Sequence, residues 1–214
     1  RQGYNAEQHA KSSRGAMSFF LLFKNADDSG RIGAFLLASE RWGFETAEDR
    51  TIGAYRLLLF RQRNLATLPL YASDKGGFIA VMGSLLFDGV PAPDCLPALL
   101  DNIKEGTSKW DKLSGTHNII AIRDETLYIQ ADALGASRIY VNEREDIWSN
   151  SFLAVCEIAQ PKHFDKQACF EYMVAGSVFG NKSLVKGIDS LPTNSILSIT
   201  DEGVQTHQRP SPVK

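Results

Sequence analysis

The sequence predicts an α+β fold in which antiparallel sheets are covered by helices. Short apolar segments alternate with polar turns along most of the chain, which is typical of strands joined by hairpins. Strands this close in sequence pair antiparallel, because a parallel pair needs a long crossover. Only three segments combine an N-cap residue with apolar residues on one helical face. With 214 residues, 43% of them apolar, the chain is long enough for one large core.

The expected strands follow one another closely. They cover Ser18–Lys24, Thr51–Arg61, Phe78–Phe87, Thr116–Arg123, Thr126–Ala131, Arg138–Asn142, Ile147–Ser149, Ser195–Thr200 and Val204–His207. Three short polar segments each close a hairpin, namely Asp124-Glu125, Glu143–Asp146 and Asp201–Gly203. Two further polar clusters, Asn25–Gly30 and Ser73–Gly77, are expected as turns.

Three helices are expected, each after a residue whose side chain can accept a hydrogen bond from the first turn. Asp94 precedes Cys95–Lys104, Ser151 precedes Phe152–Ala159, and Asp165 precedes Lys166–Val174. In the first helix, four apolar residues share one face: Leu96, Leu99, Leu100 and Ile103. In the third helix we expect the inward-facing residues to be Ala168, Cys169, Tyr172 and Met173.

Charge and cysteine content exclude several classes of function. The net charge of −2 argues against binding to nucleic acid or to an anionic membrane surface, both of which need a basic excess. Three cysteines without a C-x-x-C pair, and scattered histidines, argue against disulfides and a metal site and favour a cytoplasmic protein. The sequence contains no S-G-G-x-D or G-x-x-x-x-G-K-[ST] loop, so we expect no nucleotide or other cofactor.

Six sequence blocks from Met17 to Gly203 resemble one known family by their order and spacing. They are Arg56-Leu57 with Pro69–Tyr71, Ala80–Phe87, Leu113–Gly115 with Ile119–Ile122, Asp132–Gly135 with Ile139-Tyr140, Glu171–Met173 with Gly176, and Lys186–Ile188 with Leu191-Pro192. Together they resemble the class II glutamine amidotransferase domain at the front of asparagine synthetases, a family that includes β-lactam synthetase-like members.

The resemblance implies a four-layer αββα sandwich of the N-terminal-nucleophile (Ntn) hydrolase type. Residues 17–207 would form this domain. Residues 1–16 are polar and without period, and we interpret them as a tag or a flexible N-terminal extension. Residues 208–214 contain two prolines and are interpreted as a linker or tail.

The resemblance also places the reaction centre at Ser18, where the family has its cysteine nucleophile. A hydroxyl is a weaker nucleophile than a thiol, and Ser18 needs a free α-amine as its base. In this sequence Met17 and sixteen further residues precede it. Ser18 is therefore either a nucleophile exposed by processing or an ordinary strand residue.

The family's glutamine pocket maps onto a short set of residues. Arg56 matches the arginine that binds the substrate carboxylate, and Gly83 matches the glycine of the family's Asn-Gly-Glu motif. Met82 and Ser84 replace the other two residues of that motif, so an oxyanion donor and an ammonium partner are lost. Asp94 matches an ammonium-binding aspartate, although a helix N-cap explains it equally well. Arg56 also has a plainer interpretation, as a strand arginine that faces solvent.

These replacements predict a domain that keeps the fold without hydrolysing glutamine. We expect Phe19 and Met82 to fill the old pocket, with Arg56 and Asp94 at its rim. Such a domain would support an ATP-dependent synthetase domain of asparagine biosynthesis or another amide-forming reaction, in cis or on another chain. Pairing of two copies stays open. The alternatives are an active glutamine amidohydrolase that uses Ser18, and a small amino-acid-binding domain that uses Arg56 and Asp94.

Overall fold

The computed structural model describes residues 18–24, 29–64, 67–103 and 112–208. Their strands form two six-stranded antiparallel sheets and one small sheet. The strands of the first sheet are, in order, β13 (Asp189–Ser190), β11 (Tyr140–Asn142), β12 (Ile147–Ser149), β1 (Ser18–Lys24), β3 (Tyr55–Gln62) and β2 (Phe44–Ile52). The strands of the second sheet are, in order, β15 (Gly203–Gln208), β14 (Ser195–Thr200), β10 (Thr126–Gln130), β9 (His117–Arg123), β5 (Phe78–Gly83) and β4 (Leu70–Ala72). The small sheet joins β7, β6 and β8, which are Val90–Pro91, Leu86–Phe87 and Leu113–Ser114.

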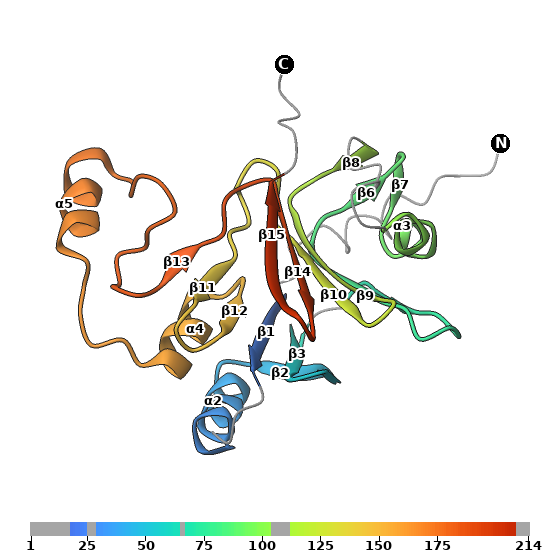
Figure 1. The fold of residues 1–214 in the computed structure, drawn as a ribbon, viewed down its shortest axis with the longest axis horizontal. Coiled ribbons are helices and arrows are strands. Elements are labelled where there is room, and N and C mark those ends of the chain that lie inside the picture. Colours follow the sequence, from blue (N-terminus) through green and yellow to red (C-terminus); the bar gives the residue numbers. More distant parts are fainter. Residues whose placement is uncertain (1–17, 25–28, 65–66, 104–111, 209–214) are drawn as a thin grey trace.

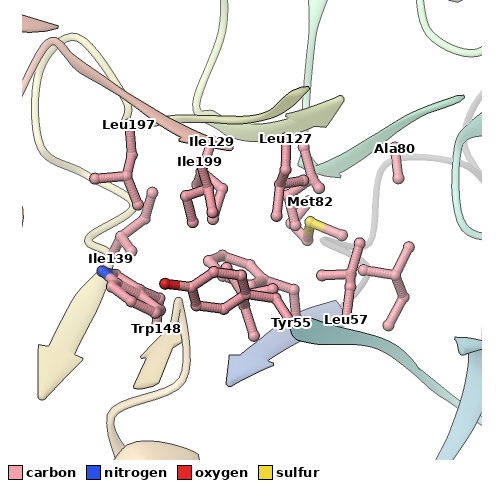
Figure 2. Packing of buried hydrophobic residues seen from close by; sticks show 14 of the residues in the cluster. Tyr55, Leu57, Ala80, Met82, Leu127, Ile129, Ile139, Trp148, Leu197 and Ile199 are labelled. Atoms are coloured by element: carbon pink, nitrogen blue, oxygen red, sulfur yellow. The ribbon is translucent and has the colours of Figure 1, made fainter. Parts of the chain in front are cut away.

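Figure 1 shows how the helices and sheets are arranged. Three apolar clusters lie between these layers. The largest lies between the two big sheets, and Figure 2 shows side chains from both sheets meeting there. A second cluster packs α2 (Ser29–Arg41) and α4 (Phe152–Ala159) on the outer face of the β1 sheet. The third packs α3 (Leu96–Asn102) on the outer face of the β5 sheet. The order helix–sheet–sheet–helix confirms the predicted α+β sandwich.

The three predicted hairpins are all present. Thr126 pairs with Arg123 across Asp124-Glu125, and both turn residues have positive φ, as a tight two-residue hairpin requires. The β11–β12 and β14–β15 hairpins also have the predicted turns. The cluster at Ser73–Gly77 forms a turn, in which the Ser73 amide donates to the Gly77 carbonyl at 2.8 Å.

Two predicted strands are interrupted by glycine. The segment Thr51–Arg61 is not one strand, because β2 ends at Ile52 and the chain reverses at Gly53, where φ is +54°. The segment Phe78–Phe87 breaks after Gly83, where φ is +103°. A Cβ on Gly83 would lie 2.3 Å from the Thr116 carbonyl oxygen, so only glycine fits the position.

Helix α2 was not predicted. It begins at Ser29, inside the polar cluster that we expected to be a turn. Gly30 and Gly33 weaken its helix propensity. Ile32 and Phe35 are nevertheless buried against the β1 sheet, so tertiary packing outweighs propensity here. The i, i+3, i+4 spacing of Ile32, Phe35 and Leu36 is the sequence signal by which this helix could have been predicted.

The other helices agree with the sequence in part. Ser151 accepts a hydrogen bond from the Ala154 amide at the start of α4, as predicted. Helix α3 has Cys95 at its N-cap and no side-chain cap bond, so the predicted capping role of Asp94 is wrong. Its predicted apolar face is buried.

Helix α5 (Lys166–Ala175) has the predicted N-cap but not the predicted inner face. Asp165 accepts a hydrogen bond from the Ala168 amide at 3.0 Å, and Ala168 is fully buried. Tyr172 and Met173, expected to face inward, are 52% and 75% exposed. In Figure 1 this helix stands at the edge of the molecule, beyond β13, where neither large sheet covers its outer side.

Candidate functional site

Ser18 begins β1 at one end of the first sheet. Its Cα lies opposite that of Arg61 in β3. Side chains alternate along a strand, and Phe20 and Leu22 belong to the cluster between the sheets. Ser18 therefore faces the inter-sheet side, and it is half-buried.

Asn150 holds the start of β1 in place. Its Oδ1 accepts a hydrogen bond from the Phe20 amide at 2.9 Å, and its Nδ2 donates to the Ser18 carbonyl at 3.3 Å. The neighbouring Ser149 hydroxyl donates to the Phe20 carbonyl. The backbone on both sides of Phe19 is thus tied to the segment between β12 and α4. Sequence reasoning missed Asn150, whose one signal is its place directly before the helix-capping Ser151.

Met82 lies in the inter-sheet cluster, on the face of β5 that looks toward β1. Its side chain is 1% exposed and shares this cluster with Phe20 and Leu59. Figure 2 shows Met82 among the side chains between the sheets. In β9 the residue opposite Met82 is Asn118, which is also buried and donates from Nδ2 to the Ser137 hydroxyl at 2.6 Å. Met82 is therefore a packed core residue in the structure.

Phe19 does not lie in this cluster. It points to the opposite face of the β1 sheet, where its ring stacks on Phe60 at 4.5 Å and meets Phe44 and Phe35 edge-on at 5.0 and 6.2 Å. The prediction that Phe19 and Met82 fill one pocket together is wrong, because strand alternation puts Phe19 on the helix side. Of the two, only Met82 adds apolar volume between the sheets.

Gly83 and Gly115 allow a close crossing of two backbone segments. The Ser84 amide donates to the Thr116 carbonyl at 2.8 Å. A Cβ on Gly115 would lie 2.3 Å from the Ser84 carbonyl, just as one on Gly83 would meet Thr116. The glycine at 83 thus has a complete structural explanation, and the Ser84 amide is already bonded.

Arg56 lies far from Ser18 along the same pair of strands. Its Cα is opposite Phe23, five residues beyond Ser18, which corresponds to roughly 17 Å along an extended strand. Its guanidinium donates two hydrogen bonds to the Asp49 carboxylate, at 3.0 and 2.7 Å. The hydrogen bond from Arg56 lowers the pKa of Asp49, and Asp49 raises the pKa of Arg56. Arg56 is therefore satisfied by its neighbour in β2.

Asp94 lies on a third layer. It is exposed and precedes Cys95, the N-cap residue of α3, on the outer side of the β5 sheet. The β5 sheet separates it from Arg56, which belongs to the β1 sheet. The expected pairing of Arg56 with Asp94 at one rim is wrong, because each lies on a different face of the sandwich.

Arg61 is the arginine that the strand register brings to the level of Ser18. Its Nε donates to Glu45 Oε1 at 2.6 Å, and its side chain is 36% exposed. The sequence analysis selected Arg56 and assigned no role to Arg61. The signal that distinguishes it is the β1–β3 register, which a motif match does not contain.

Four cavities lie among the described residues, and none of these four joins the predicted site residues. Four cavities of about 270 to 510 Å³ have linings that contain none of Ser18, Arg56, Gly83 and Asp94. Within residues 18–24, 29–64, 67–103 and 112–208, no three His, Cys, Asp or Glu side chains are grouped to hold a metal ion. No helix among these residues is long and apolar enough to span a membrane.

Comparison with known proteins gives a structural likeness only. No family model matches the sequence, and no curated protein matches it. The structure is similar to a glutamine phosphoribosylpyrophosphate (PRPP) amidotransferase from B. subtilis, complexed with ADP and GMP, with a TM-score of 0.44 and 11% identity over 90% of this chain. It is also similar to an allosteric regulatory enzyme of purine biosynthesis, with a TM-score of 0.40 and 12% identity over 94% of this chain. The chain spans 49% and 44% of the length of these two chains.

Proposed function

We propose that this chain is a glutamine amidotransferase-type domain that has lost glutaminase activity and serves an ATP-dependent amide-forming synthetase. The sequence blocks between Met17 and Gly203 support the class. The single observation that carries the proposed loss of activity is that Met82 is fully packed between the sheets. The sequence resemblance matches Met82 to the family's oxyanion-hole asparagine.

Glutamine hydrolysis needs three things at one place: a nucleophile, a base and a hydrogen-bond donor for the oxyanion. Ser18 supplies a hydroxyl in place of a thiol, and its nitrogen is in a peptide bond with Met17 in this sequence. A thioether cannot donate a hydrogen bond, and loss of one oxyanion donor typically lowers kcat by about 10²- to 10³-fold. All three changes impair the attack on the side-chain amide of glutamine, so each supports the proposed loss of glutaminase activity.

The two alternatives differ in how they fit the geometry. An amino-acid-binding domain built on Arg56 and Asp94 lacks support, because one residue is bonded to Asp49 and the other lies on the far side of the β5 sheet. An amidohydrolase that uses Ser18 requires removal of the residues before it. That alternative remains an outcome of the test below.

The test is a coupled ammonia assay with glutamine, run on the full chain and on a chain that begins at Ser18. We expect both to release ammonia at the background rate, and Ser18→Ala to change nothing. The Lys75→Glu variant, at an exposed position in the turn before β5, controls for protein handling. Turnover by either chain that Ser18→Ala abolishes would overturn the proposal and establish Ser18 as the nucleophile.

A further inference from the structure

Strand β15 leaves one edge of the second sheet open. It is the last strand in the order of that sheet, and among the described residues only β14 pairs with it. In an antiparallel pair, every second residue directs its backbone N–H and C=O groups away from the neighbouring strand. All six residues of β15 are exposed, so these outward groups are accessible. A further strand is the structure that bonds such a row of backbone groups.

The other edges of the two large sheets have features that hinder the addition of a strand. Strand β2 has a bulge between Thr46 and Glu48 and four charged residues along its length. Strand β4 has three residues and follows Pro69, and β13 has two residues. Bulges, charges, prolines and short lengths are the means by which natural sheets prevent edge-to-edge pairing.

Strand β15 has none of these features. Its sequence, GVQTHQ, contains no Lys, Arg, Asp, Glu or Pro. It pairs with β14 in an unbroken register, from Gly203 opposite Thr200 to Gln208 opposite Ser195. Within the described residues, β15 is therefore the edge of the two large sheets that is best suited to accept another strand.

The inner side of β15 lies beside a cavity. Leu197 and Ile199 of β14 face the cluster between the sheets. Thr206 and Val204 lie opposite them in β15, and residues directly opposite one another share a face. Both therefore point to the inter-sheet side, where they line a cavity of about 270 Å³ together with Trp148. A strand added beyond β15 would place every second side chain next to this cavity, so its pairing would also bury apolar surface.

A second copy of this chain fits the edge. Two β15 strands related by a two-fold axis pair antiparallel, and they bring no like charges together because the strand has no charged side chain. With Gln205 on the axis, Val204 lies opposite Thr206 of the partner subunit, and both stay on the inter-sheet side. The acidic turns Asp201-Glu202 of the two copies are then roughly 27 Å apart, well beyond the Debye length of about 8 Å.

Charges at the ends of the strand pair are complementary. The two-fold axis brings the end of each β15 strand to the acidic turn of the other copy. The sequence that follows the strand, residues 209–214, begins with Arg209, ends with Lys214 and contains no acidic residue. The strand also brings no carboxylate to the cavity, whose lining includes Glu143 and Asp146. Opposite charges at both ends favour the antiparallel arrangement of two copies.

The ends of the chain are less suited to this edge by their composition. Residues 1–17 contain no Val, Ile or Thr and one aromatic residue, whereas β-branched and aromatic residues favour strands. Residues 209–214 contain Pro210 and Pro212, and proline lacks the N–H group that a sheet requires. A second copy offers a strand that is already ordered, so the pairing loses little conformational entropy.

We propose that β15 pairs antiparallel with β15 of a second copy, so that the two β5 sheets form one continuous sheet across a two-fold axis at Gln205. A pair of six-residue strands is a small interface, so the dimer is in equilibrium with the monomer. The interface contains none of the residues of the candidate site, and it does not depend on whether the chain hydrolyses glutamine.

The test is sedimentation equilibrium of the full chain from micromolar to near-millimolar concentration. We expect the mass to rise from that of a monomer toward that of a dimer. Gln205→Lys and Gln205→Glu are each expected to weaken this association at least about tenfold, because like charges meet on the axis. A mixture of the two variants is expected to dimerise again, since each lysine then meets a glutamate. A variant that had merely failed to fold would not be rescued in this way.

Matched variants on another edge are the controls. Thr51→Lys places the same charge on an exposed residue of β2, and it is expected to leave the dimer unchanged. Under mild oxidation, Gln205→Cys is expected to form a disulfide between two copies, because residues directly opposite one another have Cα atoms about 4.5–5.5 Å apart. Thr51→Cys is expected not to form one, and the unaltered chain gives the baseline for the three native cysteines.

Three results would overturn the proposal. One is a chain that stays monomeric at every concentration, and another is a dimer that Gln205→Lys leaves intact. The third is a chain without residues 1–17 that dimerises although the full chain does not, which would show that the chain's own N-terminal residues cover the edge. None of these results alters the ammonia assay, so failure of the interface and failure of the proposed function can be distinguished.

Discussion

At the scale of single residues, Met82 and Met173 occupy opposite environments in one chain. Met82 is 1% exposed between the sheets, and Met173 is 75% exposed on α5. Met82 also stands where the resemblance puts a polar oxyanion donor. A buried methionine stabilises the fold through the contacts around it, whereas an exposed one contributes little. The loss of stability when each methionine is truncated to alanine therefore tests whether Met82 is packed in the core or lines a functional pocket.

We expect Met82→Ala to lower the free energy of unfolding by about 2–5 kcal/mol, because a fully buried side chain is removed and a cavity is left. Met173→Ala is expected to change it by less than about 0.5 kcal/mol. Urea denaturation of both variants measures the two values under the same conditions. Equal, small effects would show that the inter-sheet space around Met82 is loosely packed.

At the scale of elements, the two capped helices α4 and α5 differ in the chemistry of their caps. Ser151 uses a hydroxyl, and Asp165 uses a carboxylate. The hydrogen bond from the Ala168 amide is the main cause that lowers the pKa of Asp165, and Lys182 adds to it. The pKa of Glu171 is also lowered, first by its hydrogen bond with Gln167 and then by that with the Phe179 amide. The start of α5 and the loop that follows it are therefore sensitive to acid.

The sign of this pH dependence follows from the lowered pKa values. A carboxyl group whose folded pKa is depressed contributes stability that is fully present above its ordinary pKa of about 4. That contribution is lost as the pH falls through the lower, folded value. We expect the Ala168 amide resonance to titrate in this acidic range in an NMR series. The Ala154 amide, capped by Ser151, is expected not to follow it, and Asp165→Ala should abolish the Ala168 titration.

The elements also show what sequence patterns do and do not determine. Hairpins were predictable because turn residues and strand alternation are local signals, as at Asp124-Glu125. Helix α2 was missed because its stability comes from burying Ile32 and Phe35 on a sheet that local propensity does not describe. The exposed face of α5 was missed for the opposite reason. Tyr172 and Met173 were predicted to face inward, but they are 52% and 75% exposed, and the sequence spacing does not show which side of the helix is covered.

The candidate site was less predictable than the fold. The order of the strands was indicated by spacing, but which residue lies opposite Ser18 depends on the β1–β3 register. A motif match selected Arg56, whereas the register brings Arg61 to that level. Phe19 was assigned to the wrong face for a related reason. Both faces of β1 are buried, so the apolar sequence does not show which side chains face the other sheet and which face the helices. Register and face are tertiary properties, and a local pattern contains neither.

At the scale of the whole molecule, the sandwich keeps an apolar interior where the resembled family has its reaction centre. The two large sheets meet through Phe20, Leu59 and Met82, and the predicted substrate residues Arg56 and Asp94 are distributed to other layers. The described chain presents its most exposed apolar stripe at α5 instead. The separation of Arg56 from Asp94 is what the proposed loss of glutaminase activity leads us to expect, and the ammonia assay tests that proposal.

The most direct test of this account is the intact mass of the protein purified from the cells that make it naturally. An N-terminal-nucleophile hydrolase needs its nucleophile at the first position with a free α-amine. If Ser18 is an ordinary strand residue, the measured mass includes Met17 or a longer N-terminal segment. A mature chain that begins at Ser18 and releases ammonia from glutamine, in a reaction that Ser18→Ala abolishes, would contradict it.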